Sequence, residues 1–157
     1  MPTTGSLIDR EAAEVPASHR DLVDCPAVAA LSTVGADGYP HTSVVWCDFD
    51  GECVRVNTMR GFVKDRNMRR DPRVTLLCYD PHQPLRYLEI RGRAIEVTET
   101  RAREHLDHLA SAYAGRPVRF FGDVIATRFA DAGTPVIFRI RPIHVVAVDA
   151  ASKGEGA

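Results

Sequence analysis

The chain has 157 residues, of which 45% are hydrophobic and 26% charged, and its formal net charge is −1. This length suits one domain with a sizeable core, and the charge balance gives no reason to expect nucleic-acid or membrane partners. No apolar run is long enough to cross a membrane, and residues 1–20 lack the pattern of a signal peptide, so we expect a cytoplasmic protein.

The first part of the chain predicts a short helix and a meander of three strands. The helix is expected over Pro16–Asp24, after a loose arm at residues 1–15. Alternating apolar residues bounded by turn residues predict strands over Ala27–Val34, Pro40–Phe49 and Glu52–Met59. Asp-Gly between two such runs is a strong hairpin signal. In the second strand one face is predicted to carry His41, Ser43, Val45, Cys47 and Phe49.

The second part predicts three more strands and two helices. The helices are expected over Phe62–Arg70, ended by Asp71-Pro72, and Thr98–Ala114, with Thr98 or Thr100 as its cap. Residues 80–84 are predicted to form a loop, and 117–132 is ambiguous, with a second short helix as one reading. The strands are expected over Arg73–Tyr79, Arg86–Thr98 with a bulge or a tight bend at Gly92, and Pro135–Asp149 with an interruption at Pro142.

Six strands joined mainly by hairpins, with few helices, predict a mainly β protein built as a six-stranded antiparallel barrel. The interior of a barrel this small is filled by side chains, so a large cofactor would lie outside it, in a groove or at a subunit interface. No repeat or linker interrupts the chain. We therefore expect one domain over 1–157, with loose tails at 1–15 and 150–157.

Positive charge is concentrated between Arg60 and Arg73, where six basic and two acidic residues leave a surplus of four. The segment spans a strand end and a helix start, where free N–H groups and the helix dipole favour an anion. Thr58 offers a hydroxyl, Gly61 allows a sharp turn, and Lys64 falls in the first helical turn. These residues predict a phosphate site, and a solvated basic helix face is the alternative.

The remaining chemistry-bearing residues give weaker signals. The four cysteines have no C-x-x-C spacing and are expected to be reduced core thiols, a metal site of Cys47, Cys53 and His41 being the weaker alternative; we predict no metal. His41 is expected to be structural or at the surface, and His105 and His108 to be solvated. Trp46 is expected in the core or a dimer interface, or as an aromatic wall beside a ligand.

Three runs of sequence resemble a known superfamily. They are DGYPHTSVVW at residues 37–46, TMRGFVKDRNMRRDPR at residues 58–73 and YLEIRGRA at residues 87–94. Over roughly residues 20–148 the chain resembles the pyridoxamine 5′-phosphate oxidase-like superfamily, and within it the F420-dependent flavin/deazaflavin oxidoreductases of actinobacteria. The most specific element is K-x-R-N-x-R-R-D-P-R. The chain lacks the Arg/Ser-rich phosphate motif of true pyridoxamine phosphate oxidases, which argues against that activity.

The resemblance implies a split β-barrel that forms a homodimer, with the cofactor in a groove between the subunits. It implies that Lys64 and Thr58 bind the phosphate, beside Met59, and that Arg60 supplies a charge that relatives place where this chain has Phe62. The ring would lie along Ser43, Val44, Val45 and Trp46. The other subunit would contribute Leu85 and Arg86.

The function that the resemblance implies is hydride transfer between deazaflavin coenzyme F420 and a small organic acceptor. Such a cofactor carries the reaction, while the protein orients it and excludes water. No catalytic residue is assigned, since nothing selects Ser43 or Tyr87 as a proton donor. Two alternatives stay open: an FMN-dependent oxidoreductase of the same fold, and a non-catalytic protein that binds F420, flavin or haem.

Overall fold

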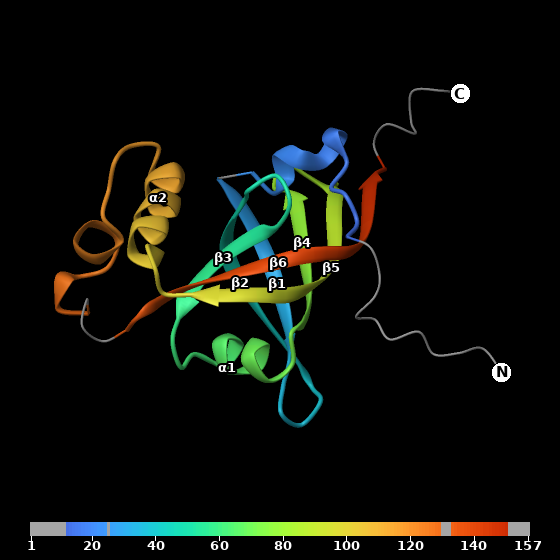
Figure 1. The fold of residues 1–157 in the computed structure, drawn as a ribbon. Coiled ribbons are helices and arrows are strands. Elements are labelled where there is room, and N and C mark those ends of the chain that lie inside the picture. The colour runs from blue at the N-terminus through green and yellow to red at the C-terminus, as the bar shows by residue number, and fades with distance from the viewer. Residues whose placement is uncertain (1–11, 25, 130–132, 151–157) are drawn as a thin grey trace.

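The computed structural model describes residues 12–24, 26–129 and 133–150. Six antiparallel strands form a closed barrel in the order β1-β2-β3-β6-β5-β4 (Figure 1). The strands are β1 Ala27–Val34, β2 Pro40–Phe49, β3 Val54–Met59, β4 Arg73–Asp80, β5 Gln83–Thr98 and β6 Pro135–Asp149. The mainly β, six-stranded antiparallel barrel predicted from the sequence is confirmed.

Short helices lie at the edges of this barrel. They are the 3-10 helix η2 Ala17–Leu22, the α-helices α1 Val63–Arg70 and α2 Ala102–Ala114, the irregular π-turn η3 Phe120–Val124 and the 3-10 turn η4 Thr127–Phe129. Helix α2 and the segment after it stand on one side of the barrel, packed against β2, β3 and β6, and α1 lies below (Figure 1). No helix in the described ranges is long and apolar enough to span a membrane.

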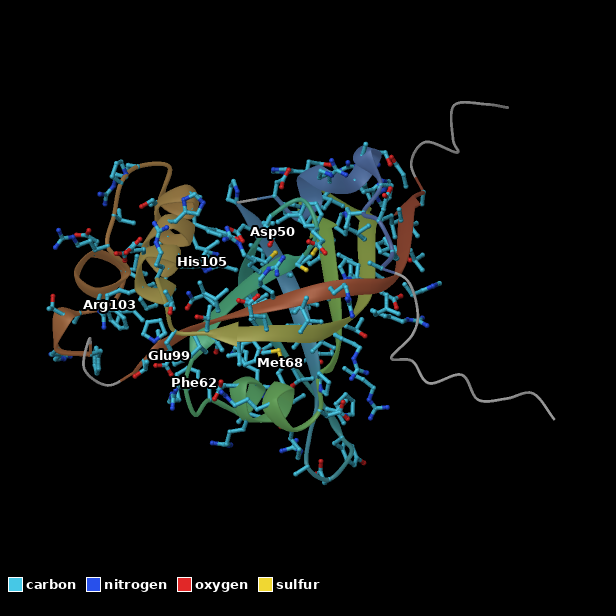
Figure 2. The ribbon with its side chains drawn as sticks, in the orientation of Figure 1. Asp50, Phe62, Met68, Glu99, Arg103 and His105 are labelled. Carbon is cyan, nitrogen blue, oxygen red and sulfur yellow. The ribbon has the colours of Figure 1, made fainter. Side chains whose placement is uncertain are left out.

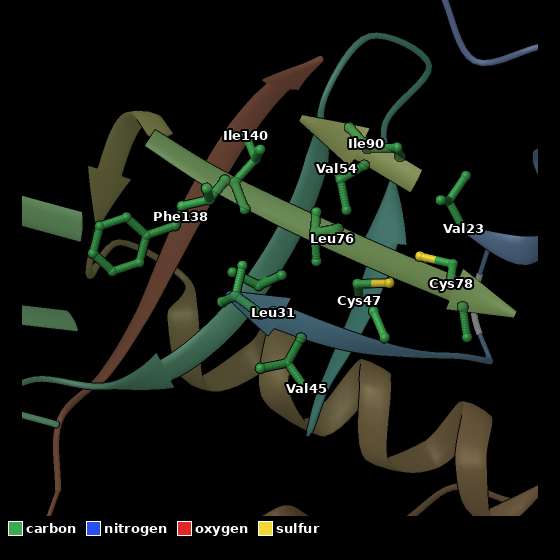
Figure 3. Packing of buried hydrophobic residues seen from close by; sticks show 14 of the residues in the cluster. Val23, Leu31, Val45, Cys47, Val54, Leu76, Cys78, Ile90, Phe138 and Ile140 are labelled. Carbon is green, nitrogen blue, oxygen red and sulfur yellow. The ribbon is translucent and has the colours of Figure 1, made fainter. Parts of the chain in front are cut away.

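Alternate residues of each strand point into the barrel and fill it with side chains, as expected for this size. Leu31, Val45, Leu76 and Ile140 meet there, and Phe138 closes one end of the cluster (Figure 3). Cys47, Cys53 and Cys78 are buried and unbridged, which confirms the predicted core thiols; Cys25 lies outside the described residues. Among the described residues no group of three or more His, Cys, Asp or Glu is placed to hold a metal ion.

Of the two features predicted for Gly92, a bulge or a tight bend, the structure has the bulge. The register between β5 and β6 shifts at Arg91/Gly92, opposite Pro142, so Ile143 has no partner on β5. Gly92 is required by close packing, because a Cβ there would lie 2.7 Å from the carbonyl oxygen of Arg141. The interruption predicted at Pro142 is therefore a bulge inside one continuous strand.

Two local predictions are wrong. Residues 80–84 do not form a loop: Asp80 pairs with Gln83 and its carboxylate accepts the N–H of His82 at 2.8 Å, so the turn is only Pro81-His82. Neither threonine caps α2, which begins at Ala102 after Arg101 turns into the left-handed region with φ 58°.

The predicted arm at residues 1–15 is described only from residue 12. Val15 is 2% exposed and belongs to the core cluster. The N–H of Ala13 donates to the carbonyl of Pro142 at 3.0 Å. This part of the arm is therefore held on the barrel, while residues 1–11 and the tail from 151 lie outside the described residues.

Strands β2 and β3 separate soon after they meet. Their ladder consists of three register pairs, from Cys47↔Val56 to Phe49↔Val54. Beyond Cys47, β2 continues to pair with β1 while β3 continues along β6 to Met59. The edge of β2 at Val44–Trp46 that faces β3 thus has no strand beside it in the described chain.

Candidate functional site

A groove of about 220 Å³ lies where β2 and β3 diverge, with α1 at one end and α2 above it. Its walls combine β2, β3, the turn into α1, α2 and η3. They are Val44, Val45, Trp46, Asn57, Thr58, Met59, Phe62, Lys64, Leu106, Leu109 and Phe120. Six of the ten predicted site residues therefore lie together: Val44, Val45, Trp46, Thr58, Met59 and Lys64.

Thr58 and Lys64 provide the polar groups predicted for phosphate binding. Thr58 is 6% exposed, and its Oγ1 is buried without a hydrogen-bond partner in the described structure. Lys64 is half-buried, and this burial lowers the pKa of its ammonium. Its Nζ lies 5.8 Å from the ring centroid of Phe62, and no carboxylate of the described residues pairs with it. A buried hydroxyl and a partly desolvated cation without a counter-ion both favour an anionic ligand.

The other basic side chains of residues 60–73 are already engaged within the chain. Two of the five arginines donate to main-chain carbonyls and three pair with carboxylates. These partners are Glu99 for Arg60, the carbonyl of Gly61 for Arg66 (2.6 Å), Asp65 for Arg69 (2.9 Å), the carbonyl of Val34 for Arg70 (2.8 Å) and Asp71 for Arg73 (2.6 Å). The positive charge of this segment is thus mostly structural, and Lys64 is the cation left for a ligand.

The turn into α1 is built by its own side chains. Gly61 adopts φ +85°, which suits glycine, and its N–H donates to the buried carboxylate of Asp65 at 2.8 Å. One N–H expected to face a phosphate is therefore occupied. Helix α1 has no side-chain cap at Phe62. Its first intrahelical bond runs from the N–H of Arg66 to the carbonyl of Phe62, so the N–H groups of the first turn lack carbonyl partners in the helix.

Aromatic rings close the groove on the side of α2. Trp46 stacks on Tyr113 with centroids 4.7 Å apart, and Phe120 meets its edge at 5.9 Å. Trp46 is half-buried and also lines the groove. Trp46 therefore packs against Tyr113 of α2 and also forms part of the groove wall, and its role beside a ligand stays a prediction.

Four predicted residues lie outside the groove lining. Ser43 faces the barrel interior opposite Leu31, and its Oγ is buried without a hydrogen-bond partner in the described chain. Arg60 is exposed and forms an ion pair with Glu99. Figure 2 shows Glu99 close to Phe62, at the end of the barrel where β3 leads into α1. Leu85, 65% exposed, and Arg86 lie in β5 and not in a loop.

Arg86 has partners within its own chain. Its guanidinium donates to both carboxylate oxygens of Asp21, at 2.7 and 2.9 Å, and to the carbonyl of Ser18. This pair holds η2 against β5. The hydrogen bond from Arg86 keeps the pKa of Asp21 below its ordinary value.

The prediction that His105 is solvated is wrong. His105 is 7% exposed and points from α2 toward the barrel (Figure 2). It meets Asp48, which is also held by two hydrogen bonds from Arg55, at 2.8 and 2.6 Å. Although burial alone would raise the pKa of Asp48, the hydrogen bonds from His105 and Arg55 hold it below its ordinary value. His108, in contrast, is exposed as expected.

Five groove residues were not anticipated from the sequence. They are Asn57, Phe62, Leu106, Leu109 and Phe120. Asn57 and Phe62 adjoin predicted residues and follow from the same strand-to-helix turn. Leu106 and Leu109 lie on the buried face of α2, and only the three-dimensional position of that helix brings them to the groove.

Comparisons with known proteins agree with this fold. The family model described as pyridoxamine 5′-phosphate oxidase matches residues 15–148. A solved structure named F420 reductase is 29% identical over 84% of this chain and 98% of its own, with a TM-score of 0.70. A conserved hypothetical protein from Mycobacterium tuberculosis is 27% identical over 91% of this chain and 89% of its own, with a TM-score of 0.67.

At lower identity the likeness concerns the fold alone. The General Stress Protein 26 of Bacillus anthracis is 20% identical over 78% of this chain and 84% of its own, with a TM-score of 0.54. None of the curated proteins matches this chain.

Proposed function

Because the chain belongs to the pyridoxamine 5′-phosphate oxidase family, we propose that it is an oxidoreductase that binds coenzyme F420 in the groove between β2 and β3. The similar structure named F420 reductase supports F420 as the cofactor. FMN is the alternative on the same fold. We further propose that residues 1–157 form a single domain and that the protein is cytoplasmic. Its substrate would be a small organic molecule.

One observation carries this proposal: Lys64 is the cation of the basic segment without a carboxylate or carbonyl partner in the described chain, and it lines the same groove as the unpartnered Thr58 hydroxyl. A phosphate there would receive hydrogen bonds from both groups. A charge-assisted hydrogen bond contributes about 1.5–3 kcal/mol, roughly ten- to hundredfold in affinity.

The residues present fit a planar redox ring beside such a phosphate. Val44 to Trp46 offer main-chain groups on an edge that β3 does not pair, and Val44 is 70% exposed. The rings of Trp46 and Phe120, with Leu106 and Leu109, give an apolar wall that excludes water. When bound, the cofactor supplies hydride transfer to or from an organic acceptor. The chain's contribution is to hold the phosphate, orient the ring and keep solvent out.

A homodimer is part of the proposal. Val44 on β2 and Leu77 on β4 both lie beside Ala30 of β1 in register, and they form an apolar stripe in which Val44 is 70% and Leu77 39% exposed. Such a stripe on an outer sheet face suits a second copy of the chain. In a dimer, the exposed Leu85 and the neighbouring Arg86 remain the residues proposed to reach the partner's cofactor. Sedimentation of the wild type against Leu77→Glu tests this: we expect a dimer and a monomer respectively.

The cofactor proposal is tested by titrating purified protein with F420 and, separately, with FMN, followed by fluorescence. We expect F420 to bind and Lys64→Ala to weaken it ten- to hundredfold. Arg116→Ala serves as the control, since it removes one positive charge from an exposed side chain outside the groove. Unchanged affinity in Lys64→Ala would remove Lys64 from the site, and binding of FMN in place of F420 would favour the FMN alternative.

A second measurement separates an enzyme from a carrier. Reduced F420 is mixed with the protein and menadione, an electron-poor quinone, and its oxidation is followed by absorbance. Acceleration that Lys64→Ala diminishes supports an oxidoreductase. Tight binding without acceleration for menadione or other acceptors would favour the non-catalytic alternative, a protein that binds F420, flavin or haem.

A further inference from the structure

A second depression, of about 510 Å³, lies on the outer face of β1, β4, β5 and β6. It shares no lining residue with the groove between β2 and β3. A row of neighbouring outward residues crosses it in register: Ser32, Thr75, Arg91 and His144. Its volume falls in the range of small-molecule sites, about 300–1,000 Å³.

The lining of this cleft is cationic. It contains Arg73, Arg91, Arg93 and His144, and none of the described residues that line it is acidic. Arg73 is paired with Asp71 and Arg91 with Glu89, each at 2.6 Å. Each of these two carboxylates thus pairs with one of the three arginines that line the cleft, and the third arginine has no carboxylate partner in the described chain.

Arg93 carries that surplus charge. It lies beside Arg73 in the β4–β5 register and makes no ion pair in the described chain. The pKa of Asp71 is held below its ordinary value mainly by the hydrogen bond from Arg73, and the charge of Arg93 adds to this effect. On its other side is Arg141 of β6, whose Nε is buried without a hydrogen-bond partner in the described chain. A half-buried guanidinium between two others is a strong attractor for a carboxylate, which it can bind through two parallel hydrogen bonds.

The bulge between β5 and β6 shapes the cleft. Because Ile143 is left out of the ladder next to Pro142, its side chain is displaced from the regular pleat and lines the depression beside His144. Val34 and Pro40, at the ends of β1 and β2, provide further apolar surface. The cleft thus combines an apolar wall with a cationic one.

We propose that this cleft binds a small organic carboxylate with an apolar body. The carboxylate lies on Arg93, and the body packs against Val34, Pro40 and Ile143. The hydroxyls of Ser32 and Thr75 offer further hydrogen bonds. This site shares no lining residue with the proposed F420 groove, and its Ser32 and Thr75 lie two residues along β1 and β4 from Ala30 and Leu77 of the proposed dimer stripe.

The test uses 4-fluorobenzoate as the probe, with binding to the cofactor-free protein followed by fluorine NMR. The uncharged 4-fluorobenzamide, of nearly the same shape, is the control ligand. We expect the benzoate to bind, the benzamide to bind at least tenfold more weakly, and Arg93→Gln to weaken benzoate binding at least tenfold. Arg93→Lys, which keeps the charge, should retain part of the affinity, and circular dichroism shows whether each variant is folded.

Two further variants separate failure of this proposal from failure of the F420 proposal. Lys64→Ala and Arg116→Gln lie outside the cleft and should bind the benzoate as the wild type does. Arg93→Gln should bind F420 like the wild type. The proposal is overturned if the benzoate does not bind, if benzoate and benzamide bind equally, or if folded Arg93→Gln binds the benzoate unchanged.

Discussion

Asp48 of β2 and His105 of α2 meet at 3.1 Å, Oδ2 to Nε2, with side chains only 7% and 5% exposed. The other ring nitrogen of His105 lies 3.2 Å from Nδ2 of Asn57, whose amide also donates to the carbonyl of Ala102 at 2.8 Å. Because both N–H groups of Asn57 are donors, the imidazole accepts at Nδ1 and carries its proton on Nε2, toward Asp48. One buried hydrogen-bond chain thus joins α2 to β2 and β3, beneath the wall of the groove.

Replacing His105 should loosen this wall. His105→Ala leaves an Asn57 donor unsatisfied and removes a hydrogen bond to Asp48, so we expect a loss of about 1–3 kcal/mol in the free energy of unfolding. Trp46, the only tryptophan of the chain, stacks on Tyr113 of α2, so its fluorescence reports helix packing directly. The control is His108→Ala, at an exposed position of the same helix, which should change neither urea unfolding nor Trp46 emission.

Acid should weaken the same chain of hydrogen bonds. The pKa of Asp48 is lower in the folded protein than in the unfolded chain, so its contribution to stability is complete above the unfolded value of about 3.9. That contribution is lost as the pH falls through the lowered folded value. Urea unfolding of wild type and Asp48→Asn should therefore differ at pH 6 and converge toward pH 2. A difference that stayed constant with pH would contradict this account.

Alkaline pH should release F420 through Lys64. Burial lowers the pKa of Lys64 in the free protein, so its ammonium is lost at a lower pH than that of an exposed lysine. A bound phosphate favours the charged form, and affinity therefore falls as the pH rises through that lowered value. Lys64→Arg, which stays charged, should remove this fall. Identical pH profiles for F420 binding to wild type and Lys64→Arg would show that Lys64 does not titrate against the ligand.

Thr58→Val separates a ligand contact from a structural one. The Thr58 hydroxyl has no hydrogen-bond partner in the described chain, so its replacement by a methyl of similar size should leave thermal unfolding unchanged or slightly raise its midpoint. F420 affinity should fall about two- to tenfold, as expected for one lost neutral hydrogen bond of about 0.5–1.5 kcal/mol. A clear loss of stability would instead indicate that the hydroxyl supports the fold.

The strands and their inward faces could be predicted from the sequence, because a period of two is a local signal. Val45 and Cys47 are buried on β2 as their alternation predicts, and Val54 and Val56 are buried on β3. The turn at Gly61 and the end of α1 before Pro72 could also be predicted from the sequence. Glycine permits, and proline restricts, backbone conformations at or next to its own position, so both signals are local.

Partners distant in sequence could not be predicted. His105 reads as a polar helix residue, and only Asp48, 57 residues away, explains its burial. The sequence alone gives no sign that Arg86 has an ion-pair partner, because Asp21 reaches it only when η2 packs against β5. The same holds for the basic segment at residues 60–73. Its surplus of positive charge can be counted in the sequence, but the carbonyls and carboxylates that pair with its arginines come from the fold, so the sequence could not show that Lys64 is left unpaired in the described chain.

The short ladder between β2 and β3 has a consequence for how this groove changes in evolution. Main-chain N–H and C=O groups are the same at every residue, so recognition through the open edge at Val44–Trp46 places little demand on side-chain identity there. Under the proposed function, replacing these side chains would change the shape presented to a substrate, while the main-chain edge proposed for the cofactor would persist. Substrate selectivity and cofactor retention would then be encoded by different atoms of the same three residues.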